Sequence, residues 1–223
     1  MKWEPTSAEM MKAVLMVLMD KEKKTDCLFW HGSPTTSTAH NREAAITIGR
    51  FYKEKMTKNI FLNGHSHLVC SLRGLAYPGL EVFTDELERC GVRRDDISII
   101  AGADHTAAES ETLLKMMHDQ DLRAVTIVTA PHHQLRCFLQ IIASMKKLGI
   151  FVKAYNRTFH VVDWSKPLAK PLLGGGTMDG TLVDHVQGEY DRIVKYAQKD
   201  GVDFTPNATI PEMFEYLRIR DEM

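Results

Sequence analysis

Residues 124–149 read AVTIVTAPHHQLRCFLQIIASMKKLG, and this stretch decides the fold class. Its first six residues form a short apolar run rich in β-branched side chains, which predicts a strand over Ala124–Thr129. From His133 to Leu148 apolar residues recur at helical spacing, and Gly149 then marks the end of the predicted helix. A strand that leads directly into a helix is the repeating unit of α/β folds.

The same alternation of strand and helix extends through the rest of the chain. Capping-box spacing at Thr6-x-x-Glu9 and at Thr106-x-x-Glu109 predicts two helix starts. The other predicted strands lie at 26–31, 59–62, 97–101 and 151–154, and the other predicted helices lie at 39–55, 80–90, 181–199 and 211–218. This order predicts an α/β fold on a doubly wound, mostly parallel five-stranded sheet with helices on both faces.

Length and composition are those of one globular domain. The 223 residues, of which 44% are hydrophobic and 26% charged, can bury one sizeable core. We therefore predict a single α/β domain over 1–223, with a core at about 26–156 and a C-terminal helical extension at about 157–223. The formal net charge of −1 gives no basic surplus for phosphate contacts, so we expect no nucleic-acid partner.

Neither the cysteines nor the apolar segments indicate export or a membrane. Cys27, Cys70, Cys90 and Cys137 form no CxxC pair, and we expect buried, reduced thiols. The apolar run over 13–19 is far shorter than the ~20 residues of a membrane span and follows no basic leader. We therefore expect a cytoplasmic protein with no membrane partner, and the sequence indicates no oligomeric state.

Polar or ionisable residues follow four consecutive predicted strands. The carboxyl ends of parallel strands meet at one edge of a sheet, and folds of this class bind ligands there, so these residues should converge on one pocket. The candidate ligand-binding residues are Gly32, Ser33, Arg42, Asn63, Gly64, His65, Asp104, Thr106, Thr129, His132 and Arg136. The competing interpretation is that each of them is an ordinary solvated loop residue.

Two arginines, a histidine and a glutamate carry the predicted chemistry. Arg42 and Arg136 are the candidate anion clamps, because a guanidinium can hold a carboxylate or phosphate with two hydrogen bonds. The helix start at Thr106 presents free N–H groups to the same kind of ligand. His133 lies three residues before Arg136 on one helical face and, with Glu109, is the candidate catalytic group. The alternatives are surface arginines and side chains that only cap their own helices.

Known cofactor and metal fingerprints are mostly absent from the sequence. No GxGxxG follows a strand, and there is no GxxxxGK[ST] or GxSxG motif. His65 and His67, together with His132, His105 or Asp104, have the donor types of a zinc or iron site, but their spacing matches no standard zinc pattern. We therefore expect no bound metal.

The segment over 128–137, VTAPHHQLRC, resembles a motif of the YdcF/SanA/ElyC family of bacterial proteins, in which a Val-Thr-Ser run precedes a histidine and an arginine. Arg42 matches the arginine of that family's first helix, and Gly64 matches the glycine after its second strand. Glu109 matches the acidic residue at a helix start, and residues 189–196, EYDRIVKY, resemble the closing helix.

The resemblance extends from about residue 26 to residue 200 and departs from the family at several polar positions. Ser110 stands where the family has asparagine, and Ala130 and Asn63 stand where it has serine. The resemblance implies a Rossmann-like fold and a divergent, soluble, YdcF-like member. It also implies a ligand pocket at the predicted sheet edge, for which S-adenosylmethionine is the leading candidate.

Three functions are compatible with these observations. The first is an enzyme or binding protein for a small anionic or nucleoside-type molecule, such as S-adenosylmethionine. The second is a metal-assisted hydrolase or transferase that acts on a phosphorylated or carboxylated small molecule. The third is a non-catalytic scaffold or regulator with a vestigial pocket, which the altered residues Asn63, Ser110 and Ala130 would fit.

Overall fold

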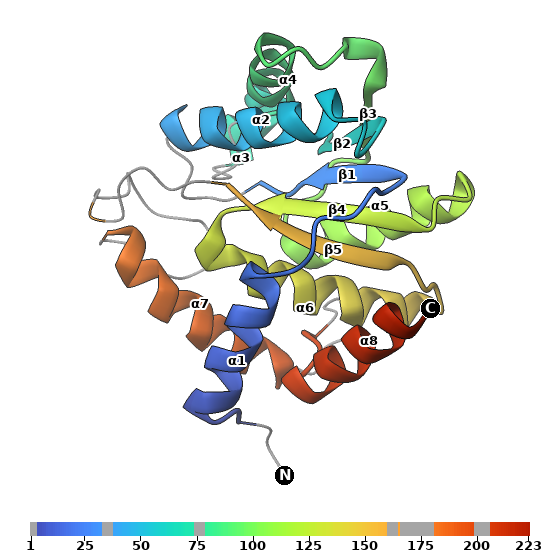
Figure 1. Ribbon diagram of the computed structural model, residues 1–223. Coiled ribbons are helices and arrows are strands. Elements are labelled where there is room, and N and C mark those ends of the chain that lie inside the picture. Colours follow the sequence, from blue (N-terminus) through green and yellow to red (C-terminus); the bar gives the residue numbers. More distant parts are fainter. Residues whose placement is uncertain (1–3, 33–37, 74–78, 160–164, 166–180, 199–205) are drawn as a thin grey trace.

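The computed structural model describes residues 4–32, 38–73, 79–159, 165, 181–198 and 206–223. It contains a five-stranded sheet in the order β3-β2-β1-β4-β5, and every pairing of adjacent strands in it is parallel (Figure 1). The chain runs outward from β1 to β3 and then returns to the other side of β1 with β4. The predicted doubly wound α/β fold is confirmed.

The strands are short, and the central ones are apolar. They are β1 (Cys27–Trp30), β2 (Asn59–Asn63), β3 (Ile97–Ile100), β4 (Ala124–Thr129) and β5 (Lys153–Thr158). All of β1 and all but the first residue of β4 are buried, as expected for central strands that are covered on both faces. The prediction for β4 has the observed bounds.

Helices cover both faces of the sheet (Figure 1). One face carries α2 (Thr38–Lys53) and α4 (Leu80–Arg89), with the short α3 (His67–Arg73) beside α4. The helices associated with the other face are α1 (Ser7–Leu18), α5 (Thr106–Asp119), α6 (Pro131–Leu148), α7 (Leu182–Ala197) and α8 (Ile210–Glu222). A 3-10 turn over Arg94–Asp96 precedes β3.

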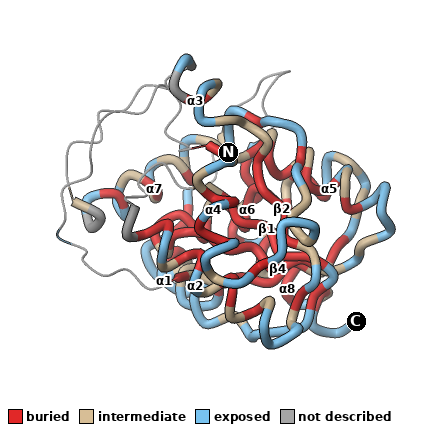
Figure 2. Tube along the Cα trace, turned by 90° about the horizontal axis from the view of Figure 1, so that it is seen from above, coloured by how far each residue is buried: buried red, intermediate tan, exposed pale blue. Residues whose placement is uncertain are grey.

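The alternation of side chains along β1 divides the core into two layers. Phe29 belongs to the layer formed with α1, α5, α6 and α8, whereas Leu28 and Trp30 belong to the layer formed with α2 and α4. Trp30 stacks on Phe83 of α4 with ring centroids 3.8 Å apart. Figure 2 shows β1, β2, β4 and α6 as the buried centre, with exposed residues around them.

Helix α5 does not begin with the predicted capping box. Thr6 and Glu9 form such a box at the start of α1, but the N-cap of α5 is His105, whose ring accepts a hydrogen bond from the backbone N–H of Ala108 at 3.2 Å. The predicted box at Thr106 and Glu109 is therefore wrong. The Glu109 carboxylate is buried and faces other polar groups, so it is not available to cap its own helix.

Two further predictions need correction. The last strand lies at Lys153–Thr158 and not at 151–154, because polar residues of an edge strand hide its pattern in the sequence. Helix α3 falls within 66–79, which the sequence indicates only as a polar connector. The proline- and glycine-containing loop expected around 167–176 lies outside the described residues.

Candidate functional site

Polar residues that follow β1, β2 and β4 lie at the carboxyl edge of the sheet. His31 directly follows β1, Asn63 ends β2, and α6 begins two residues after Thr129, the last residue of β4. The strand order reverses between β1 and β4, and this is the topological switch point at which α/β folds bind ligands. The structure therefore places several of the predicted residues at one edge.

Glu109 of α5 reaches this edge and joins His31 to Asn63. Its Oε2 atom lies 2.8 Å from Nε2 of His31, and its Oε1 atom accepts a hydrogen bond of 2.7 Å from Nδ2 of Asn63. The Oδ1 atom of Asn63 accepts hydrogen bonds from the backbone N–H groups of His65 and Ala103. An ionised carboxylate that is only 7% exposed requires such partners.

His133 and Arg136 of α6 both contact Glu189 of α7. The Nδ1 atom of His133 lies 3.1 Å from Oε2 of Glu189, and Arg136 contacts both carboxylate oxygens. Arg192 donates a hydrogen bond of 2.9 Å to the same carboxylate, and Arg136 also donates one of 3.0 Å to Oγ1 of Thr106. Glu189 thereby fixes α7 against the start of α6.

Cys137 lies between these two groups of contacts. It is fully buried on α6, about one helical turn after His133. The potential ligand atoms of His31, His133 and Cys137 all lie within 4.8 Å of one another, and the two imidazole rings meet edge-on with centroids 5.2 Å apart. We refer to five residues as the thiol cluster, namely Glu109, His31, Cys137, His133 and Glu189.

The members of the thiol cluster shift the pKa values of one another. Burial alone would raise the pKa of the Cys137 thiol, but His133 and His31 outweigh burial and lower it to about 6. Burial alone would lower the pKa of His31, but Cys137 and Glu109 raise it well above its ordinary value. Burial alone would likewise raise the pKa of Glu189, yet its cationic neighbours hold it well below the usual range. The arrangement therefore favours a thiolate flanked by two imidazolium rings.

Three other predicted binding residues lie next to the thiol cluster. Thr106 contacts it indirectly, through Arg136. Thr129 and His132 are buried at the turn between β4 and α6, and burial lowers the pKa of His132 to about 3, so its ring is neutral. The ring of His132 lies 6.1 Å from that of His185 on α7.

The remaining predicted side chains are more exposed. His65 pairs with Asp104 through a contact of 2.6 Å between Nε2 and Oδ1, and His67 is exposed at the start of α3. Arg42 of α2 has a side chain that is 51% exposed and a long contact of 3.4 Å with Glu86. These residues lie outside the thiol cluster.

The glycines at this edge serve close backbone contacts. A Cβ atom on Gly64 would lie 2.4 Å from the carbonyl oxygen of Ile100, so the ends of β2 and β3 can approach only because position 64 lacks a side chain. The carbonyl oxygen of Gly32 lies 3.0 Å from Nδ1 of His31. Ser33 lies outside the described residues.

The potential metal-binding side chains that lie close together in the structure differ from those considered in the sequence. Among the described residues, three such side chains with mutually close ligand atoms are His31, His133 and Cys137. That group does not include the histidines weighed from sequence spacing, which are His65, His67 and His132.

Sequence reasoning did not identify Cys137 as a site residue and gave no role to His31. One available signal was spacing, because Cys137 follows His133 by four residues and therefore shares its helical face. The role of Glu189 had no local signal, since it lies 56 residues beyond its partner His133. Only the packing of α7 against α6 brings those two side chains together.

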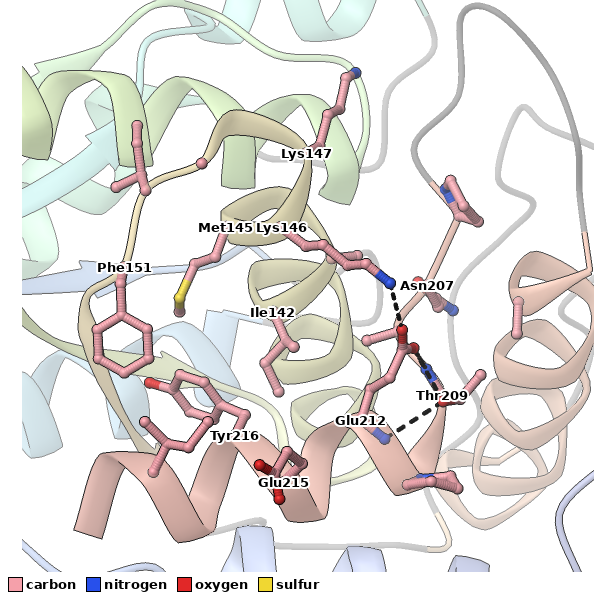
Figure 3. A pocket seen from close by; sticks show the side chains of 18 residues that line it. Ile142, Met145, Lys146, Lys147, Phe151, Asn207, Thr209, Glu212, Glu215 and Tyr216 are labelled. Carbon is pink, nitrogen blue, oxygen red and sulfur yellow. Dashed lines mark hydrogen bonds and ion pairs between the residues drawn. The ribbon is translucent and has the colours of Figure 1, made fainter. Parts of the chain in front are cut away.

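A separate groove of about 1080 Å³ lies toward the other end of α6 (Figure 3). Its lining is mostly apolar and includes Ile142, Met145, Phe151 and Tyr216. At its rim Nζ of Lys146 bonds Oε1 of Glu212 at 2.8 Å. Because α6 runs away from the carboxyl edge of β4 toward the start of β5, the groove lies apart from the thiol cluster.

Comparisons with known proteins assign no family to the chain. No protein-family model matches it, and no curated protein shows significant similarity to it. In the described ranges, no helix combines the length and the apolar character needed to cross a bilayer. The inferences about function therefore rest on the residues, on their geometry and on the resemblance of residues 128–137 to a family motif.

Proposed function

We propose that this protein binds a small anionic or nucleoside-type molecule over the thiol cluster and acts on it as a transferase or hydrolase. S-adenosylmethionine is the leading candidate ligand, because residues 128–137 resemble the YdcF/SanA/ElyC motif. The observation that carries the proposal is the position of the thiol cluster at the switch point of the sheet.

A purely structural role gives a poor account of the thiol cluster. Removing charges from water costs several kcal/mol per ion, and well-packed apolar side chains often replace a buried ion pair without loss of stability. Side chains with strongly shifted pKa values are concentrated at catalytic sites. Five ionisable groups at the ligand-binding edge of an α/β sheet therefore favour a chemical role.

The contacts suggest distinct roles for the two predicted anion clamps. Arg136 already holds Glu189 and Thr106, so within this proposal it positions His133, which exchanges protons with the ligand. Arg42 is the better candidate for the anionic end of the ligand, because its guanidinium is half exposed and its contact with Glu86 is long.

Calorimetric titration of the full chain with S-adenosylmethionine and S-adenosylhomocysteine tests the proposal. We expect saturable binding, and we expect Arg42→Ala to weaken it at least tenfold, about 1.4 kcal/mol. Arg50→Ala is the matched control, because Arg50 lies on the same helix but pairs with Glu22 near the end of α2.

The titration has two outcomes that contradict the proposal. The absence of heat from both ligands at millimolar concentration would exclude the S-adenosyl class. Equal affinities of the Arg42→Ala and Arg50→Ala variants would exclude Arg42 as the anion contact. The proposal is supported if the wild type binds the ligand and if Arg42→Ala weakens this binding whereas Arg50→Ala does not. That result would support both the ligand class and the role of Arg42 as the anion contact.

The convergence of two imidazoles and a thiol favours metal-assisted hydrolysis or transfer as a second candidate function. Its test is hydrolysis of an aryl phosphate and an aryl acetate by chelator-treated protein, with and without added zinc. We expect zinc-dependent turnover by the wild type and none by Cys137→Ala. Equal rates with and without zinc would eliminate this candidate.

A further inference from the structure

We propose that His31, His133 and Cys137 form a binding site for a divalent transition-metal ion, with zinc as the preferred ion. The sequence-based expectation of no metal was built on other histidines and on the interpretation that no cysteine joins them. The metal site uses the same cluster as the proposed function, but it does not require the organic ligand.

The distances are close to those of a metal site. The three potential ligand atoms lie within 4.8 Å of one another. Zinc–nitrogen bonds of about 2.0–2.1 Å and zinc–sulfur bonds of about 2.3 Å place two nitrogens and one sulfur of a tetrahedral site roughly 3.3–3.6 Å apart. Small rotations of the two imidazoles and the thiol therefore suffice to close the site around an ion.

Both histidines have a nitrogen available for coordination. Glu189 faces Nδ1 of His133, which leaves Nε2 of that ring for a metal. Nε2 of His31 lies 2.8 Å from Oε2 of Glu109 as an ion pair, and within the described part of the chain this buried nitrogen makes no hydrogen bond of good geometry.

The charges around the site favour a dication. The Cys137 thiolate and the carboxylates of Glu109 and Glu189 carry negative charge in a buried region, and Arg136 and the partly exposed Arg192 both pair with Glu189. A divalent ion bound between neutral imidazoles balances the two negative charges of Cys137 and Glu109. Without an ion, the same balance requires both rings to be protonated.

The carboxylates have the positions of residues that orient metal ligands. Histidine ligands usually donate their second N–H to a carboxylate or carbonyl, which fixes the tautomer and strengthens the metal bond. Glu189 has this position toward His133, and Arg136 and Arg192 hold it there. The carbonyl of Gly32, 3.0 Å from Nδ1 of His31, has the corresponding position on the other ring.

The donor set indicates zinc and leaves room for chemistry. Two imidazoles and one thiolate are typical ligands of zinc, whereas oxygen-only donors suit magnesium or calcium. Three protein ligands leave the fourth tetrahedral position for water or for a substrate atom, as in catalytic zinc sites. A purely structural zinc site would normally have four protein ligands.

Metal content and cobalt spectra of the untagged full chain test the proposal. Because Cys137 is fully buried, the protein is unfolded in guanidinium with chelator and refolded with one equivalent of zinc or cobalt. We expect about one tightly held ion per chain. We also expect the cobalt form to show sulfur-to-cobalt charge transfer together with intense tetrahedral ligand-field bands.

Variants separate this site from other thiols and histidines. Cys137→Ser and His133→Gln should each weaken zinc binding by at least about 100-fold, and Cys137→Ser should abolish the charge-transfer band. Cys90→Ser and His65→Gln are the matched controls, since Cys90 is only partly buried and His65 pairs with Asp104 outside the thiol cluster. Both controls should bind zinc as the wild type does.

The proposal is overturned if the refolded wild type holds less than about a tenth of an equivalent of zinc, or if its cobalt form lacks thiolate charge transfer. Equal zinc affinities of Cys137→Ser and Cys90→Ser would also overturn it. The wild-type cobalt spectrum decides the question even if Cys137→Ser does not fold. Titration of the metal-free protein with S-adenosylmethionine separates a failure of the metal site from a failure of the proposed ligand.

Discussion

Among the charged groups buried in the described part of the chain, two clusters differ in how completely their polar groups are paired. One is the thiol cluster at the carboxyl edge. The other is the Asp20–Arg220 cluster, which consists of Asp20 after α1, Arg220 of α8 and Asn156 of β5. The side chains of Asp20 and Arg220 are 4% and 2% exposed, so both clusters are removed from water.

The Asp20–Arg220 cluster is fully explained by the fold. Arg220 donates two hydrogen bonds to the Asp20 carboxylate, at 2.7 and 2.9 Å, and a third to the carbonyl oxygen of Ala154. Asp20 also accepts bonds from the backbone and side-chain N–H groups of Asn156. This pairing joins α1, β5 and α8. The three residues of the cluster include no nucleophile and no group of side chains typical of a transition-metal site.

The thiol cluster is different, because packing alone does not account for its members. It combines a nucleophile, two imidazoles and two carboxylates, and Nε2 of His31 has no well-directed hydrogen bond in the described structure. Burial of charge is therefore a weak sign of function. An incompletely paired set of reactive groups at a ligand-binding edge is a stronger one.

The largest effect on stability should come from the Asp20–Arg220 cluster. Arg220→Met leaves Asp20 buried without its cationic partner, and we expect it to lower the free energy of unfolding by about 3–5 kcal/mol. Urea denaturation measures the loss. The double variant Asp20→Asn/Arg220→Met should recover part of it, because no unpaired charge remains. A loss below about 1 kcal/mol in Arg220→Met would refute the distinction between the two clusters.

The next effect concerns the geometry of the carboxyl edge. Gly64→Ala forces a Cβ against the carbonyl of Ile100, and we expect a loss of about 1–3 kcal/mol together with weaker zinc binding, since Asn63 and Glu109 must shift. Gly149→Ala is the control, with φ of 65° and open space around the position. It should be less stable by about 1–2 kcal/mol but bind zinc normally.

Removal of the Cys137 thiol should affect zinc binding more than it affects the free energy of unfolding of the metal-free protein. In the presence of chelator we expect Cys137→Ala to lower the free energy of unfolding by only about 1 kcal/mol, because the deleted group is small. With zinc present, the difference from the wild type should grow, since only the wild type is stabilised by the ion. Thermal unfolding with and without zinc measures both values, and a zinc-independent difference would contradict the expectation.

The smallest effect should come from the start of α8, away from both clusters. Thr209 and Glu212 form a capping box there, so Thr209→Ala should cost about 1 kcal/mol. Zinc content and ligand affinity should remain those of the wild type. A change in either of them would show that the groove bordered by these residues is coupled to the carboxyl edge.

Local sequence patterns were sufficient for most of the fold. The β-branched run of β4 reflects a strand covered on both faces, and the helical spacing of α6 reflects a helix packed along one face. Both patterns can be read from neighbouring residues in the sequence. β5 was harder, because its polar residues are buried by partners distant in the sequence. Asn156, for example, is paired with Asp20, 136 residues away.

The candidate site was predictable only at the level of the sheet edge. Because the carboxyl ends of parallel strands converge, the sequence could place His133 and Arg136 near the ends of other strands. It could not show that Glu109 faces His31 in place of capping α5, since both uses fit the same spacing. The contribution of Cys137 depends on the rotation of α6 against β1, which tertiary packing decides.

The link between Asp20 and Arg220 spans 200 residues, and this separation has a consequence for the order of assembly. During synthesis, α8 is made after all five strands, so the sheet and its carboxyl edge can form while Asp20 is still hydrated. Docking of α8 is then the step that fixes α1 and β5. Proteolytic removal of residues 210–223 would consequently loosen α1 and β5 before it disturbed the surroundings of Cys137.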